Sequence, residues 1–358
     1  MFTLAARTMG YGVVVLDPDP MSPAAEMANE HLCADYGDQY ALARLAEQCA
    51  AVTTEFENPP AASLEELSRH CLVRPNANCV AIAQDRVQEK SFLCGAGFAV
   101  APYATIACVS DLETAFAKIG FPAVLKVSRL GYDGKGQVRV ETQQQAREAF
   151  IMLQGAPCVM EQFLSLKLEV SVVLARTADG QTAYFSVAEN RHSNGILDLS
   201  IVPARISADL ARRAQEMAIG IAAALDYCGV LAVEFFVLDD DALLVNEIAP
   251  RPHNSGHFTL DACITSQFEQ QVRTLCGLAL GNPKQHTAAV MVNLLGDVWN
   301  DSSPRWEAIL GQANVKLHLY GKREARPGRK MGHFTVCADS VEDALNTALA
   351  IRAGLASR

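Results

Sequence analysis

The sequence lacks the features that mark several large classes of protein. No uninterrupted apolar run approaches the roughly 18 residues of a membrane-spanning helix, and the N-terminus has no signal-peptide pattern. The 11 cysteines are odd in number and scattered, and no C-x-x-C pair occurs. These patterns argue against a membrane span, a disulfide framework and a zinc site, and they favour reduced thiols in a cytoplasmic protein.

The sequence also has fewer basic than acidic residues. The chain of 358 residues has 30 Lys and Arg against 40 Asp and Glu, a net charge of -10. This balance argues against a general nucleic-acid or anionic-membrane role, although it permits local basic pockets. Neither a Walker A motif nor a dinucleotide fingerprint ahead of a helix is present, which disfavours a dehydrogenase. The length suits two or three packed domains of ordinary globular composition.

The strongest signal that is present is a predicted β-hairpin rich in carboxylates. Two apolar runs flank Asp239–Asp241, and a turn centred in these aspartates pairs Leu238 with Leu243. Glu234 then faces Glu247 across the strands, about 5 Å apart at the β-carbons. Two like charges there are destabilising unless a cation lies between them, and Mg²⁺ is a suitable candidate. The alternatives are a bulge that turns one glutamate away, or an exposed pair.

Polar donors follow this hairpin at high density. Arg251, His253, Asn254, Ser255 and His257 stand within seven positions. Donors of this kind just beyond two carboxylates suggest an anionic substrate beside a metal.

A glycine-rich loop provides a second signal. A predicted strand with Lys126 precedes Gly131, Gly134 and Gly136, and another strand begins at Gln137. Glycines let backbone N–H groups approach an anion closely, and the strand lysine can reach nucleotide phosphates. Glycine-rich hairpin loops are, however, often only turns.

Two further stretches suggest ligand contacts. Cys158–Leu164 and Leu168–Ala175 are predicted strands joined by a linker, which suits a flat adenine slot or is simply a strand pair. Lys322–Lys330 has five cations in nine residues. It is either a solvated loop or a site for a phosphate monoester.

The remaining pattern is that of a mixed α/β protein. Further helices are predicted at 2–9, 23–31, 39–49, 78–93, 208–225, 261–280 and 341–355, and further strands at 13–16, 51–56, 289–294, 315–319 and 332–338. The strand at 51–56 delivers Glu55 and Glu57 to its carboxyl end. The chain opens in a helix, where an open nucleotide-binding sheet would begin with a strand and a glycine-rich turn.

These motifs together resemble those of the ATP-grasp ligases, and among them the carboxyaminoimidazole ribonucleotide synthases. The resemblance is carried by Asn246–Arg251 with His253–His257, by Gly131–Gln137, and by the K-x-x-x-R-P-G-R-K-M-G-H pattern that begins at Lys322. It implies an ATP-grasp fold (α/β and α+β) divided into residues 1–78, 79–282 and 283–358. The first part is an open parallel α/β domain without its first strand, the second the ATP-grasp domain, and the third a small α/β domain.

The resemblance also implies an activity. ATP and bicarbonate would give carboxyphosphate, which carboxylates the amine of aminoimidazole ribonucleotide in purine biosynthesis. Mg²⁺ would be required, and a homodimer is implied. The alternatives are another ATP-grasp ligase, or a nucleotide-binding protein without turnover because the first strand and glycine-rich turn are missing.

Individual residues take roles from the same resemblance. The implied metal ligands are Glu234 and Glu247, and the implied catalytic residues are Arg251, Tyr132 and Asp133. The implied ATP contacts are Arg86, Lys126, Gly131, Gly134, Gly136, Gln137, Glu161, Leu164, Glu169, Glu189 and Asn246. The implied substrate contacts are His253, Asn254, Ser255, Lys322 and Arg329.

Overall fold

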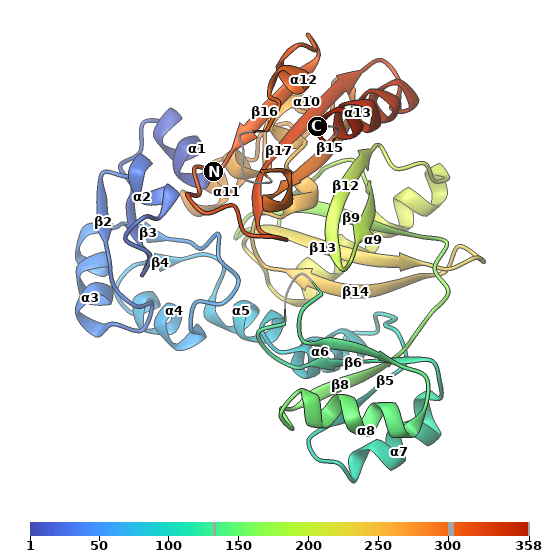
Figure 1. The fold of residues 1–358 in the computed structure, drawn as a ribbon. Coiled ribbons are helices and arrows are strands. Elements are labelled where there is room, and N and C mark those ends of the chain that lie inside the picture. Colours follow the sequence, from blue (N-terminus) through green and yellow to red (C-terminus); the bar gives the residue numbers. More distant parts are fainter. Residues whose placement is uncertain (132–133, 300–303, 357–358) are drawn as a thin grey trace.

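The computed structural model describes residues 1–131, 134–299 and 304–356. Its helices and strands form the mixed α/β architecture that the sequence predicts. In Figure 1 a large central sheet, whose strands run in colour from green to red, adjoins an N-terminal region (blue) and a smaller sheet with two helices (teal to green).

The N-terminal region contains two short parallel strand pairs with helices packed around them. Its elements are α1 (Phe2–Thr8), β1 (Val14–Leu16), α2 (Pro23–Met27), β2 (Glu30–Leu32), α3 (Gln39–Gln48), β3 (Ala51–Val52), α4 (Ala61–Ser68) and β4 (Leu72–Val73). Strand β1 pairs with β2, and β3 pairs with β4. Leucines and valines of these elements form one buried cluster. Helices α5 (Ala77–Ala83) and α6 (Arg86–Gly95) lead to the next region.

A four-stranded sheet follows, in the order β5-β8-β6-β7. Its elements are β5 (Tyr103–Ile106), α7 (Asp111–Ile119), β6 (Ala123–Val127), β7 (Gln137–Val140), α8 (Gln143–Met152) and β8 (Cys158–Gln162). Buried residues of α7 and α8 pack with those of the strands into one core. The glycine loop connects β6 to β7.

The central sheet is nine-stranded, in the order β14-β13-β9-β11-β12-β15-β17-β16, with β10 paired to β9. Its first part comprises β9 (Leu168–Arg176), β10 (Thr182–Tyr184), β11 (Ala188–Ser193), β12 (Ile196–Val202), α9 (Ala208–Ala224), β13 (Gly229–Val237) and β14 (Leu243–Ala249). Helix α9 packs on one face, against Leu231, Val233 and Phe235. The alternate residues of β13, including Val230, Ala232 and Glu234, therefore point to the other face.

The C-terminal strands continue this same sheet. After η1 (Asn254–Gly256), the elements are α10 (Thr259–Ala262), α11 (Gln267–Leu275), β15 (Ala288–Leu295), η2 (Gly296–Val298), α12 (Glu307–Leu310), β16 (Val315–Leu319), β17 (Lys330–Ala338) and α13 (Val341–Ala356). Strand β12 pairs with β15, which joins the C-terminal strands to the ones before them. Figure 1 shows the red strands as an extension of the yellow and green ones.

Three predicted helices differ from those observed. The helix predicted at 23–31 ends at Met27, because the following residues form strand β2. The helix predicted at 78–93 is two helices, and the Asp85 side chain caps the second by accepting from the N–H groups of Val87 and Gln88. The helix predicted at 261–280 is likewise divided, and Ser266 caps α11. The strand predicted at 51–56 is shorter, Ala51–Val52.

Candidate active site

One cavity collects most of the residues to which the sequence assigned a role. It has a volume of about 680 Å³ and lies where the four-stranded sheet, the central sheet and the loop after β14 meet. The predicted residues that line it are Arg86, Lys126, Gly131, Gly134, Gln137, Glu161, Leu164, Glu169, Glu234, Asn246, Glu247, Arg251, His253 and Asn254. Its volume is in the range of small-molecule sites.

The two hairpin glutamates are cross-strand partners, as predicted, but the register near the turn is different. Glu234 pairs with Glu247, whereas Leu243 pairs with Val237 and not with Leu238. The register shifts by one residue at a β-bulge beside Asn246. A bulge turns following side chains to the opposite face.

This bulge has a clear physical reason. Leu243 and Val245 lie in the core under α9, and so does Ile248, an even-numbered position. Without the bulge, Glu247 would share the face of Leu243 and Val245. The bulge lets these apolar residues be buried while Glu247 faces the cavity.

The two glutamates have unequal proton affinities. Burial, and then the charge of Glu247, raise the pKa of Glu234 to about 7. Burial also acts to raise the pKa of Glu247, but Arg86 and Lys126 lower it overall. Arg86 Nη1 donates to Glu247 Oε2 at 3.1 Å. The central-sheet side of the cavity thus has more negative charge than its neighbours neutralise.

On the side of the cavity formed by the four-stranded sheet, positive charge exceeds negative charge. Lys126 Nζ donates to Glu161 Oε2 at 3.0 Å, and Lys90 Nζ lies 3.2 Å from Glu161 Oε1. The Lys90 and Glu161 side chains are almost fully buried, at 1% and 3% exposure. Two lysines therefore share one carboxylate, which leaves a surplus positive charge beside the cavity.

Two residues of α6 have no role in the sequence-based assignment. Lys90 stands one helical turn after Arg86, and this i, i+4 spacing is the signal that could have identified it. Glu89 Oε1 accepts the N–H of Ile248 at 2.6 Å. Burial, and then Glu247, raise the pKa of Glu89 to about 8.

Arg251 connects the N-terminal region to the cavity. Its Nη2 and Nε atoms donate to Glu57 Oε2 at 2.5 and 3.2 Å. Glu57, which the sequence places after a strand end, lines the cavity as well. Arg251 is therefore held by a carboxylate that comes from a remote part of the chain.

The glycine loop packs tightly against the turn between β11 and β12. Gly134 has φ +74°, and a β-carbon there would lie 3.0 Å from Asn194 O and 3.1 Å from Gly195 Cα. Close backbone approach together with positive φ requires glycine at this position. Tyr132 and Asp133 lie outside the described residues.

Five predicted site residues do not line the cavity. The Glu189 carboxylate accepts from Arg205 Nε at 2.9 Å, Ser255 is fully buried, and Gly136 packs on Val127. Lys322 Nζ donates to Lys330 O at 2.8 Å, and Arg329 Nη1 donates to Glu324 O at 3.0 Å. Lys330, which has no predicted role, does line the cavity.

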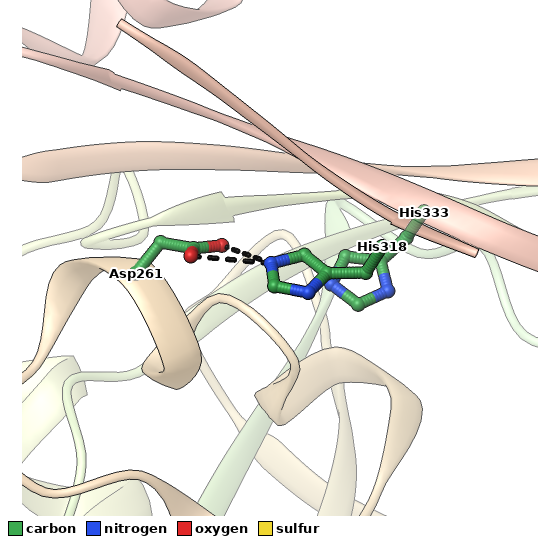
Figure 2. Close-up of side chains that lie close together, drawn as sticks. All are labelled: Asp261, His318 and His333. Atoms are coloured by element: carbon green, nitrogen blue, oxygen red, sulfur yellow. Dashed lines mark hydrogen bonds and ion pairs between the residues drawn. The ribbon is translucent and has the colours of Figure 1, made fainter. Parts of the chain in front are cut away.

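A second group of titratable side chains lies between α10 and the C-terminal strands. Figure 2 shows Asp261 beside His318, whose Nε2 lies 2.9 Å from Asp261 Oδ2, with the His333 ring behind. The two imidazoles stack at 4.6 Å with an interplanar angle of 18°. Imidazole lone pairs lie in the ring plane, so stacked rings do not direct them to one point. The group is a hydrogen-bonded cluster, with Tyr320 Oη at 2.9 Å from His333 Nδ1.

Within the described ranges, no helix combines the length and apolar character that a bilayer crossing needs.

Comparisons with known proteins agree with this geometry. Family models match residues 1–84 (ribonucleotide synthetase preATP-grasp domain), 91–268 (ATP-grasp domain) and 289–347 (phosphoribosylaminoimidazole carboxylase C-terminal domain). The chain is similar to the N5-carboxyaminoimidazole ribonucleotide synthase of Brucella melitensis, at 46% identity over 94% of this chain and 92% of that protein.

Solved structures are similar along nearly the whole chain. The N5-carboxyaminoimidazole ribonucleotide synthetase of Thermus thermophilus has a TM-score of 0.92 and 38% identity, covering 100% of this chain and 96% of that one. The synthase of Aspergillus clavatus in complex with ADP and 5-aminoimidazole ribonucleotide has a TM-score of 0.91 and 29% identity, covering 99% and 95%. The predicted ATP-grasp fold is thereby confirmed.

Proposed function

The chain belongs to the N5-carboxyaminoimidazole ribonucleotide synthase family of ATP-grasp ligases, and from this premise we propose how the two sides of its cavity perform the reaction. It is an ATP-dependent ligase that carboxylates 5-aminoimidazole ribonucleotide to the N5-carboxyamino product in purine biosynthesis. The observation that carries the proposal is the opposed charge at one cavity. On one side Lys126, which lines the cavity, shares Glu161 with the buried Lys90, and on the other side two glutamates line it.

Bicarbonate is the proposed source of the new carboxylate. Its oxygen attacks the γ-phosphorus of ATP, ADP leaves, and carboxyphosphate forms. The exocyclic amine of the ribonucleotide then attacks the carboxyl carbon of carboxyphosphate, or attacks CO₂ that carboxyphosphate has released. Phosphate leaves and the amine loses a proton, which gives the carbamate. Arg251 stabilises the carboxyphosphate anion through its guanidinium, which Glu57 orients.

The donor set fits Mg²⁺. Two carboxylates pair across one strand ladder, and burial, and then the charge of Glu247, raise the pKa of Glu234 to about 7. A hard divalent cation with oxygen ligands relieves this charge. When bound there with ATP, Mg²⁺ supplies electrostatic stabilisation of the transferring phosphoryl group. Glu234 and Glu247 would hold it.

The nucleotide lies along the opposite side in this proposal. Lys126 contacts its phosphates, and Lys90, buried behind Glu161, adds positive charge there without lining the cavity. The glycine loop with Gln137 covers the phosphates. Glu161 and Leu164 border the adenine, and Glu169 binds the ribose hydroxyls. The other nucleotide positions proposed are Arg86, Gly131, Gly134, Gly136, Glu189 and Asn246.

The ribonucleotide lies beside the loop after β14. His253 and Asn254 border the cavity, and the proposed phosphate ligands are Lys322 and Arg329. Each of these two cations donates one hydrogen bond to a backbone carbonyl, which leaves further N–H donors for a phosphate. Tyr132 and Asp133, outside the described residues, are proposed to face bicarbonate and the imidazole.

Three coarser features complete the proposal. We assign residues 1–78 to substrate binding, 79–282 to the ATP-grasp domain and 283–358 to the C-terminal domain. A reducing, cytoplasmic compartment is supported by the eleven cysteines, all of which are in the described ranges and free of disulfides. A homodimer is proposed from the family resemblance.

Steady-state assays test the function. ADP release is measured with Mg²⁺-ATP and bicarbonate, with and without aminoimidazole ribonucleotide. We expect the ribonucleotide to stimulate release, and Glu247→Ala to abolish the stimulation. Asp239→Asn, an exposed carboxylate change on the same hairpin, serves as the control. An equal rate of ADP release with and without the ribonucleotide would contradict the proposal.

A further inference from the structure

A series of buried polar side chains lies under the loop after β14. Ser200 Oγ on β12 donates to Asn190 Oδ1 on β11 at 2.8 Å, and Asn190 Nδ2 donates to Ser171 Oγ on β9 at 2.9 Å. Ser171 Oγ donates to Ser255 Oγ in η1 at 2.7 Å. We call Ser200, Asn190, Ser171 and Ser255 the serine relay. Their exposed fractions are 0%, 5%, 1% and 0%, and none of the four lines the cavity.

The serine relay ends at the imidazole of His253. Ser255 Oγ lies 2.9 Å from His253 Nδ1, and His253 Nε2 lies 3.2 Å from Glu234 Oε1. Strand pairing explains the convergence, because Ser171 is the direct cross-strand neighbour of Glu234. Ser171 and Glu234 therefore lie side by side in the sheet. Ser255 and His253, which follow the sheet, connect the two side chains by hydrogen bonds.

The hydrogen bonds at Nδ1 determine the tautomer of His253. The backbone N–H of Ser255, which can only donate, points to Nδ1 at 3.3 Å. Ser255 Oγ accepts from Ser171, so its own proton is free to donate to Nδ1 as well. With Nδ1 an acceptor, the neutral ring has its proton on Nε2, directed at Glu234.

The serine relay is not needed to hold the His253 backbone. Gln267 does this separately, since its Oε1 accepts from His253 N at 2.8 Å and its Nε2 donates to His253 O at 2.7 Å. The serine relay therefore acts on the imidazole ring of His253, through Nδ1, and not on its main chain.

We propose that the serine relay consists of positioning residues, which hold His253 as the Nε2–H tautomer so that it donates to Glu234 Oε1 and leaves Oε2 for a divalent cation. This inference rests on the proposed function, because it takes Glu234 as a cation ligand. Hydrogen bonds behind the atoms that bind a metal commonly set metal affinity and ligand orientation.

The first test is spectroscopic and needs no turnover. ¹⁵N NMR of the full chain labelled at histidine nitrogens, assigned with a His253→Gln variant, reports which ring nitrogen is protonated. We expect a proton on Nε2 of His253 in the wild type and a mixture of tautomers in Ser255→Ala. A proton on Nδ1 in the wild type would overturn the proposal, even if the enzyme is fully active.

The second test separates positioning from structure. In Ser255→Ala we expect the Mg²⁺ concentration for half-maximal activity to rise about 10-fold, with kcat at saturating Mg²⁺ within about twofold. Ser63→Ala removes a buried hydroxyl elsewhere, in α4, and should leave both values unchanged. If Ser255→Ala and Ser63→Ala have the same Mg²⁺ requirement, the serine relay does not act through Glu234.

A conservative replacement sharpens the result. In His253→Gln the amide nitrogen can take the place of the Nε2–H donor, whereas in His253→Asn it reaches only the position of Nδ1. We expect His253→Gln to keep a Mg²⁺ requirement nearer to the wild type than His253→Asn does. The reverse order would contradict the proposal. A wild type with the Nε2 proton but no Mg²⁺ dependence would instead contradict the proposed cation site.

Discussion

The two sides of the cavity are built with opposite charge and from different sheets. On the four-stranded sheet, Glu161 is shared by Lys90 and Lys126. On the central sheet, Glu234 and Glu247 pair across the hairpin ladder. One side has an excess cation and the other an excess carboxylate, and Lys90, Glu161 and Glu234 are buried.

This difference shows what the site is built to receive. Buried like charges are costly, so neither side is at its most stable with the protein alone. A polyphosphate completes the first side and a divalent cation the second, and a metal–nucleotide complex supplies both at once. The charges that the protein places on the two sides thus match the ligand proposed for it.

The largest effect is expected from a change to the pair Glu234 and Glu247 on the central sheet, which we call the anionic side. Glu247→Gln removes a proposed cation ligand and leaves Arg86 without its partner. We expect kcat to fall about 100- to 1000-fold, as when a group that stabilises transition-state charge is lost. Steady-state ADP release measures this, with Asp239→Asn as the matched control. A loss below about threefold would mean that the second glutamate is not needed.

The next largest effect is expected from a change to Glu161, which Lys90 and Lys126 share on the four-stranded sheet. We call this the cationic side. Glu161→Gln leaves two buried lysines without their shared carboxylate, and we expect the free energy of unfolding to fall by about 3 kcal/mol. Saturating Mg²⁺-ATP should recover part of the loss, because its phosphates replace the missing anion. Urea unfolding with and without ATP measures both the loss and its recovery. The control is Glu148→Gln, which changes an exposed carboxylate on α8. An equal loss in both conditions would argue against phosphate binding beside these lysines.

A smaller effect is expected outside the two sides, at the proposed ribonucleotide phosphate site. Arg329→Ala should raise the KM for the ribonucleotide about 30-fold, the effect of one charge-assisted hydrogen bond, and leave the KM for ATP unchanged. Arg323→Ala, an exposed cation in the same loop, is the control. If Arg329→Ala has no effect, Lys330, which lines the cavity, becomes the candidate phosphate ligand.

The smallest effect is the pH dependence of the anionic side. The raised pKa of Glu234, about 7, means that the folded protein holds a proton that the unfolded chain releases. Stability from this group is fully present below the ordinary glutamate pKa of about 4.3 and is lost as the pH rises through about 7.

Cation binding has the opposite dependence, because it needs the ionised carboxylate. We expect the apparent Mg²⁺ affinity to fall about fivefold between about pH 7 and about pH 6, because the ionised fraction of a carboxylate with a pKa of about 7 falls by that factor. Titrations followed by thermal unfolding measure it. Glu234→Gln should flatten the dependence, and a wild type whose Mg²⁺ affinity is constant over this range would contradict it.

Much of the site was accessible from local sequence because its motifs are short and contiguous. The glutamate pairing, Lys126 and the donors after β14 could be placed from strand alternation and spacing. The bulge at Asn246 could have been recognised too, since the apolar positions change from odd at Leu243 and Val245 to even at Ile248. Lys90 needed only the spacing from Arg86, but helical spacing alone does not distinguish a buried lysine from a solvated one.

Other features depend on contacts between remote segments. The division of the helix predicted at 78–93 depends on Asp85, which caps α6 and also accepts from Ser128. The orientation of Arg251 depends on Glu57, 194 residues away. Such contacts have no local signal, because they arise only when separate elements pack.

The sequence by itself determined the alternation of its strands, the identity of the two opposed carboxylates, and a set of motifs specific enough to indicate the family. Only the tertiary structure decided which cations neutralise which anions, that Ser255 is buried, and that Lys322 and Arg329 do not line the cavity. The reason is physical. Strand periodicity and turn chemistry are properties of neighbouring residues, whereas burial, proton affinity and hydrogen-bond direction are set by the groups that folding brings together.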